Sequence, residues 1–193
     1  MNTDVGYAIA TGCLVLFSLL GAFDGIYFHM LKYKLHEHPP AKLEHQIHTF
    51  RGWLFIPIAL IFFVWNSSGI VLWLGLALLC IDFITETVDI MVEKEARKEL
   101  GGISSAETVI HVMATGFRMA AIAIVLAFKP TFAYSIIETR PLSPLPSHLS
   151  NIGTLFVGGL ILALGTQYIQ SLMVRWKTNY PSNRCCMRPV CTV

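Results

Sequence analysis

The chain has 193 residues, of which 54% are hydrophobic and only 13% are charged. This balance excludes an ordinary soluble domain of that length, and a formal net charge of +2 gives no reason to expect a nucleic-acid partner. We therefore predict an all-α integral membrane protein. Five apolar segments are long enough to cross about 30 Å of hydrocarbon: roughly Tyr7 to Leu31, Ile47 to Trp65, Gly69 to Asp89, Val109 to Phe128 and Ile152 to Val174.

The predicted organisation is a single five-helix domain over residues 1–178, followed by a tail over 179–193 that contains Cys185, Cys186 and Cys191. Most lysines and arginines lie in the tail and in the loops on one side of the predicted helices, whereas the other side has only Lys129 and Arg140. The positive-inside rule then predicts an outer N-terminus and a cytoplasmic C-terminus, as in a protein of the bacterial inner membrane.

The first predicted helix ends in polar residues. At about 100° per residue, Asp24 and Tyr27 lie on one face, and His29 and His36 lie on another. The histidines are near the membrane surface, where we expect solvated or hydrogen-bonded side chains at least as often as metal ligands. Pro39 and Pro40 interrupt the chain, so a new helix is predicted to begin near Lys42.

The second predicted helix begins with a polar stripe. Glu44, His48 and Arg51 follow one another at helical spacing, and His45 lies alongside. Taken singly, Glu44 and His45 are typical of an interface with water, as are Glu93 and Glu107 on the next two predicted helices. Together with the stripes on the other helices they indicate a binding site.

The third predicted helix ends in the sequence DFITETVDIMVE. Its carboxylates Asp82, Glu86, Asp89 and Glu93 fall within an arc of about 60°. Apolar residues cover the rest of the surface, so the stripe is predicted to face the interior of a helix bundle. We expect Glu93, at the end of the run, to be solvated.

The fourth predicted helix follows Gly101 and Gly102, which stop the third helix, and it can be capped by Ser104 or Ser105. Its polar residues are Glu107, His111 and Arg118 at i, i+4 and i+11. The short connection makes the third and fourth helices antiparallel. We therefore expect Glu107 near Glu93 or Asp89, and Arg118 near Asp82.

These stripes lie at a similar depth, because the end of helix one, the start of helix two, the end of helix three and the start of helix four are on the same side. The fold prediction is thus a bundle of helices one to four around a polar site. Six carboxylates outnumber Arg51 and Arg118 by four charges, an excess that two divalent metal ions would neutralise. The predicted metal ligands are Asp24, Glu44, His45, His48, Asp82, Glu86, Asp89, Glu107 and His111.

Imidazole and carboxylate together suit iron, zinc or manganese, whereas calcium and magnesium prefer oxygen alone. Tyr27 is a candidate proton donor, and Arg51 and Arg118 are candidates to hold carboxylates or an anionic head group.

Two resemblances bear on this site. The pairs Glu44-x-x-x-His48 and Glu107-x-x-x-His111 are similar to the Glu-x-x-His motifs of ferritin-like di-metal carboxylate bundles, and this similarity implies a di-iron centre. The strings DGIYFHMLKYKLHEHP and EHQIHTFR resemble those of small multi-pass membrane proteins of bacteria, over residues 24–118. That second resemblance implies a membrane fold and no particular activity.

The first functional hypothesis is a di-metal membrane oxidoreductase, with iron favoured, that acts on a lipid, a quinone or another apolar substrate. A zinc-dependent membrane hydrolase and a transporter of protons or divalent cations stay open as alternatives, as does a haem-binding subunit that uses His48 and His111. Expected partners are membrane lipids, with a homo-oligomer or a larger membrane complex left open. The run GIVLWLGLALLC offers no ligands beyond Asp82 and argues against a transport path.

Overall fold

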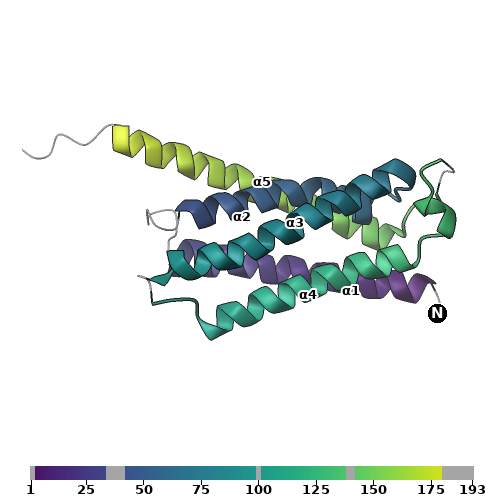
Figure 1. The fold of residues 1–193 in the computed structure, drawn as a ribbon, viewed down its shortest axis with the longest axis horizontal. Coiled ribbons are helices and arrows are strands. Elements are labelled where there is room, and N and C mark those ends of the chain that lie inside the picture. Colours follow the sequence, from purple (N-terminus) through teal and green to yellow (C-terminus); the bar gives the residue numbers. More distant parts are fainter. Residues whose placement is uncertain (1–2, 34–41, 99–100, 138–141, 180–193) are drawn as a thin grey trace, which may run out of the picture.

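The computed structural model describes residues 3–33, 42–98, 101–137 and 142–179, and over these ranges every regular element is helical. The predicted cysteine tail and His36 lie outside the described residues. The elements, drawn in Figure 1, are α1 (Thr3–Phe23), η1 (Asp24–Lys32), α2 (Lys42–Ala59), η4 (Leu60–Val64), α3 (Gly69–Ala96), α4 (Ser105–Ala127), η6 (Thr131–Tyr134) and α5 (Ser147–Asn179).

The five predicted spans are confirmed as helices that are long and apolar enough to cross a membrane. The first runs unbroken from α1 into the π-helix η1, and the second runs from α2 into the π-helix η4. Pro57 lies inside α2, where it removes a backbone donor, and the shift to η4 follows it. A helix beginning near Lys42 is likewise confirmed.

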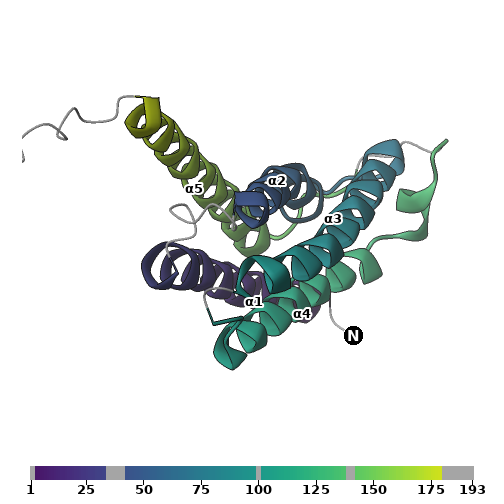
Figure 2. The same cartoon turned by 60° about the vertical axis from the view of Figure 1, so that its left-hand side comes forward.

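The helices pack as two pairs, α1 with α4 and α2 with α3. Helix α5 packs against α1, α2 and η4, and its C-terminal end extends past the bundle (Figure 1). Helices α3 and α4 follow each other in the sequence, yet their backbones approach closely at few positions within the described ranges. Figure 2 shows the same pairing from another side.

One end of the bundle, the apolar half, is a close-packed core. We define it by the buried side chains of Leu14, Phe62, Leu72, Ile122 and Val125, which come from α1, η4, α3 and α4. Gly75 allows α3 to approach η4, because a Cβ there would collide with Ile61 and Phe62. This half lies next to the connecting residues 65–68, 128–137 and 142–146.

The buried side chain of Lys129 forms hydrogen bonds between these connections. Lys129 donates hydrogen bonds to Asn66 Oδ1 and to the Ser67 carbonyl, both at 2.8 Å. Asn66 in turn donates to the Ser143 carbonyl at 2.6 Å. Burial lowers the pKa of Lys129 to about 8.

The connection between α3 and α4 has the predicted glycines and the predicted serine cap. Gly101 and Gly102 have φ of 89° and 81°, a region that favours glycine, and they separate the two helices. Ser104 is the N-cap of α4, where its side chain accepts from the Glu107 backbone N–H at 3.3 Å.

Candidate metal centre

The carboxylate stripe on α3 faces the bundle, as its helical phase predicts. Asp82, Asp89 and Glu93 are buried, whereas Ile84 and Met91 on the other side are exposed. The expectation that Glu93 is a solvated end is wrong, because this residue is only 2% exposed. Helix α3 continues to Ala96, well past the apolar run, and so carries Glu93 into the bundle.

The π-helix η1 corrects the prediction for the end of the first helix. In an α-helix, Asp24 and His29 would point about 140° apart. In η1 the hydrogen bonds span five residues, as in the bond from Tyr33 N–H to Phe28 O at 2.9 Å. His29 Nε2 consequently lies 3.4 Å from Asp24 Oδ2. Tyr27 instead stacks on Phe23 with its side chain exposed, so the structure does not bring it to the site.

Two groups of side chains have the composition and spacing of metal ligands. The first comprises Asp24, His29, Glu107 and His111, and the second comprises His29, Glu44 and His48. In each group one donor atom per residue lies within 4.8 Å of all the others. Metal bonds of about 2.0–2.2 Å place ligand atoms up to about 4.4 Å apart, so small movements would complete either site. His29 belongs to both groups, which are therefore adjacent.

His48 has the environment of a metal-binding histidine. Its Nδ1 lies 3.2 Å from Asp89 Oδ2, and that oxygen also accepts from Arg51 at 3.0 Å. Its Nε2 is buried and has no hydrogen-bond partner among the described residues. A carboxylate on one ring nitrogen fixes the ring and leaves the other nitrogen available as a ligand. Asp89, predicted as a ligand, instead contacts Nδ1 of His48 and holds the orientation of that ring.

Glu44 and Glu107 are fully buried, so the alternative that they are interfacial residues in water is wrong. Both are held by Arg97, which is buried at the end of α3. Arg97 Nη2 lies 2.6 Å from Glu44 Oε1, and its Nη1 lies 3.0 Å from Glu107 Oε1. Glu107 Oε2 is buried without a hydrogen-bond partner in the described part of the chain.

Sequence reasoning missed Arg97 because it assigned this residue to a loop. Arg97 also lies 3.3 Å from Glu93, and its guanidinium lies over the Tyr33 ring. Burial alone would lower the pKa of Arg97, but the hydrogen bond and charge of Glu44, with the charges of Glu107 and Glu93, raise it. The available signal was helical phase, since Arg97 falls four residues after Glu93 on the same stripe.

Two other arginines occupy the middle of the bundle. Arg118 contacts Asp82 at 2.6 Å and Glu86 at 2.5 Å, which confirms the predicted approach of Arg118 to Asp82. Arg51 lies 3.0 Å from Glu86 and 3.5 Å from Asp82. Thr115 donates a further hydrogen bond to Glu86 at 2.6 Å. Asp82 and Glu86, both predicted as metal ligands, are therefore engaged by arginine and belong to neither ligand group.

The remaining predicted ligand, His45, also lies outside both groups. His29 is the opposite case, since it was not among the predicted ligands and the structure places it in both groups. The described carboxylates of the cluster are Asp24, Glu44, Asp82, Glu86, Asp89, Glu93 and Glu107, and they face Arg51, Arg97 and Arg118. With all seven carboxylates ionised and the histidines neutral, three guanidinium groups would leave an excess of four negative charges.

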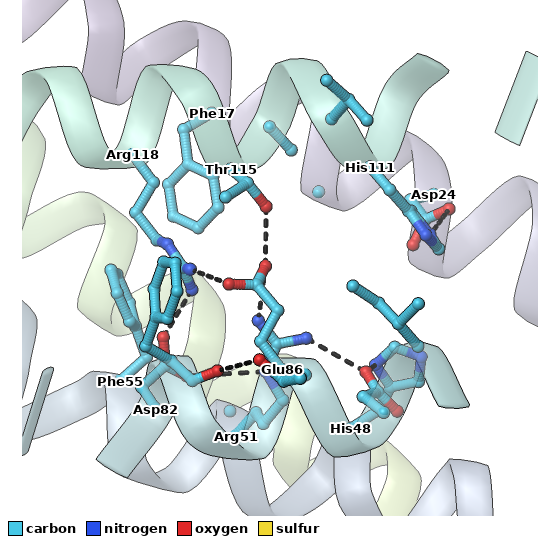
Figure 3. Close-up of a pocket in the computed structure, with 18 of the residues that line it drawn as sticks. Phe17, Asp24, His48, Arg51, Phe55, Asp82, Glu86, His111, Thr115 and Arg118 are labelled. Carbon is cyan, nitrogen blue, oxygen red and sulfur yellow. Dashed lines mark hydrogen bonds and ion pairs between the residues drawn. The ribbon is translucent and has the colours of Figure 1, made fainter. Parts of the chain in front are cut away.

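A cavity of about 490 Å³ lies beside this cluster, and Figure 3 shows its interior. Asp24, His48 and His111 lie on one side of the cavity (Figure 3). The aromatic rings of Phe17 and Phe55 lie on the other side, where the Arg118 guanidinium lies over the Phe55 ring. Its volume falls within the range of about 300–1,000 Å³ that small-molecule sites occupy.

Comparison of the chain with protein families, with curated proteins and with solved structures finds no match.

Proposed function

We propose that the chain is an integral membrane metalloprotein that binds two divalent metal ions, with iron favoured, and that it is an oxidoreductase for an apolar or lipid-like substrate. One observation carries the proposal: two ligand groups of histidine and carboxylate share His29. The unpartnered buried atoms His48 Nε2 and Glu107 Oε2 support it, because each is a donor atom that a cation would satisfy.

The charge of the cluster supports the same conclusion. Four uncompensated carboxylates buried among membrane helices are costly unless protons or cations neutralise them. Two divalent ions supply four positive charges. Calcium and magnesium fit less well than iron, because histidine supplies nitrogen donors in both groups.

The chain's own residues hold the ligands in place. Asp89 and Arg51 fix the ring of His48, and Arg97 fixes the carboxylates of Glu44 and Glu107. Such outer contacts set the orientation and basicity of metal ligands. Iron bound there would supply one-electron redox chemistry, and the adjacent cavity would position an apolar substrate against the polar wall.

The structure argues against the transport alternative. A transport path needs polar groups or water through both halves of the membrane. In the apolar half, Leu14, Phe62 and Leu72 are completely buried and closely packed. Among the described residues no acidic stripe continues through that core.

Metal analysis of the purified protein tests the proposal. We expect about two equivalents of transition metal in the wild type, loss of both in His29→Ala, and loss of about one in His48→Ala or His111→Ala. His148→Ala is the matched control, because His148 is an exposed histidine on α5. Thermal unfolding of each variant shows whether the fold is kept.

A wild-type content below about 0.2 equivalents of any transition metal would contradict the proposal. Absorption in the near ultraviolet separates the metals, since oxo-bridged iron absorbs there and zinc does not. A colourless protein with two zinc ions would replace the oxidoreductase by the hydrolase alternative.

A further inference from the structure

The side of the bundle between α3 and α4 is spanned by side chains and not by helix packing. Thr115 Oγ1 and Arg118 Nη1 of α4 reach Glu86 and Asp82 of α3, each at 2.6 Å. The backbone of α3 packs instead against α2, and the backbone of α4 packs against α1. Figure 3 shows Glu86 extending across this space to Thr115. The cavity therefore opens between two helices that polar side chains, and not close backbone packing, join.

The rim of this opening is apolar and exposed. Phe83 and Ile90 of α3 are 50% and 60% exposed, and Val112 of α4 is 67% exposed. All three side chains also line the cavity. Helices α3 and α4 are long and apolar enough to cross a membrane, and in a bilayer that they span these exposed residues would face the acyl chains. The cavity would then be open toward the hydrocarbon region.

The cavity has distinct apolar and polar ends. Phe17, Phe55 and Phe156 form an aromatic cluster with ring centroids 5.4–5.7 Å apart, and they line its apolar wall with Leu160. The polar wall includes His111, which belongs to one of the two ligand groups. A molecule that matches both ends has an apolar tail and a small head that forms hydrogen bonds.

The charge of the wall selects the head group. The cavity-lining carboxylates are Asp24, Asp82, Glu86, Asp89 and Glu93, and the lining cations are Arg51 and Arg118. Both arginines are already paired with carboxylates, so neither is free to bind an anionic head. Divalent ions at the proposed centre would remove the excess that favours a cationic head. A neutral hydroxyl or carbonyl head fits this balance.

We infer that the opening between α3 and α4 is the entrance through which a neutral, single-chain lipid with a hydroxyl head passes from the bilayer to the cavity. The choice of a neutral head rests on the proposed metal centre. The chain enters between Phe83, Ile90 and Val112, its tail lies along the aromatic wall, and its hydroxyl reaches the polar wall.

Photolabelling in phosphatidylcholine vesicles tests the inference. The probes are three C16 chains with the same diazirine and different heads: hexadecanol, hexadecanoic acid and hexadecyltrimethylammonium. We expect the alcohol to label residues 83–90 of α3 and 112–115 of α4, and excess hexadecanol to compete with it. The acid and the ammonium probes should label these segments about tenfold less.

A blocked entrance provides the matched comparison. Val112→Trp should lower the competable labelling by about tenfold, and Ile90→Trp is the second variant if the first does not fold. Leu162→Trp is the control, because Leu162 is 73% exposed on α5 and does not line the cavity. Its labelling should match the wild type.

Two results would overturn the inference. The first is labelling of α3 and α4 that excess hexadecanol does not reduce and that equals the labelling around Leu162 on α5, because it would come from lipid that surrounds the protein. The second is equal labelling by all three probes, because it would show that the cavity does not select a neutral head. Metal content measured on the same vesicles separates the proposals. Two bound metals without competable labelling leave the metal centre standing and overturn the entrance. Competable labelling by the alcohol without metal leaves the entrance standing and overturns the metal centre.

Discussion

The two halves of the bundle hold their helices together by different means. In the apolar half, side chains such as Phe62 and Ile122 fill the space between helices completely. In the polar half, long charged side chains such as Arg118 and Glu86 bridge helices that remain apart, and a cavity of about 490 Å³ lies among them. Close packing leaves no room for a ligand, whereas ionic bridges span a gap and leave one.

The energetics of the halves differ for the same reason. Between membrane helices there is little hydrophobic driving force, because lipid is as apolar as leucine, so the apolar half depends on the fit of its side chains. Buried ion pairs add little net stability but are costly when one partner is removed. The apolar half therefore sets the stability of the fold, and the polar half tolerates change only if its charges stay balanced.

The largest effect is expected where a buried charge loses its partner. Arg97→Met leaves Glu44, Glu93 and Glu107 without their shared cation and should lower the free energy of unfolding by about 3–5 kcal/mol. Thermal unfolding in detergent measures the change. Lys98→Met is the matched control, because the neighbouring Lys98 is 73% exposed and should change stability by under about 0.5 kcal/mol.

Arg97→Lys sharpens this test. It keeps the charge but loses the planar group that contacts three carboxylates, so its effect should fall between those of wild type and Arg97→Met. Equal stability of Arg97→Met and Lys98→Met would mean that the three carboxylates are not ionised together around Arg97.

An effect of the same size is expected in the apolar half. Phe62→Ala removes a completely buried ring and should lower the free energy of unfolding by about 3–5 kcal/mol through the space it leaves. Metal content of the protein that remains folded should be unchanged, because Phe62 lies outside both ligand groups. Leu74→Ala, at an exposed position on the same side of the bundle, is the control. Loss of metal without loss of stability would reverse the roles assigned to the two halves.

The smallest effect is a pH dependence at Lys129, the buried cation of the apolar end, whose described partners are neutral. Its pKa is about 8 in the folded protein against 10.5 ordinarily. Between these values the unfolded chain binds the proton more tightly, so folded stability should rise as pH increases from about 8 to about 10. Melting temperatures of wild type and Lys129→Met should diverge over this window by a few degrees. Parallel curves would show that Lys129 titrates normally.

Much of the site was predictable because helical phase is a property of sequence alone. The stripe of Asp82, Asp89 and Glu93 faces the bundle as its spacing requires, and Arg118 meets Asp82 as antiparallel helices require. Prediction failed where the backbone departs from an α-helix. The π-helix η1 turns His29 toward Asp24, and no pattern of polar residues indicates that change of register.

The sequence by itself determined the five apolar helices, their order and the face of α3 that carries the carboxylates. Those features depend on composition and on a fixed rotation per residue. Only the tertiary structure decided which carboxylates meet histidine and which meet arginine, because all are acidic residues on helices at one depth. It placed Asp24, Glu44 and Glu107 in groups with histidine, although Arg97 also contacts Glu44 and Glu107, and it left Asp82 and Glu86 outside these groups, in contact with arginines. Side-chain reach and backbone register differ by only a few ångströms between the two outcomes.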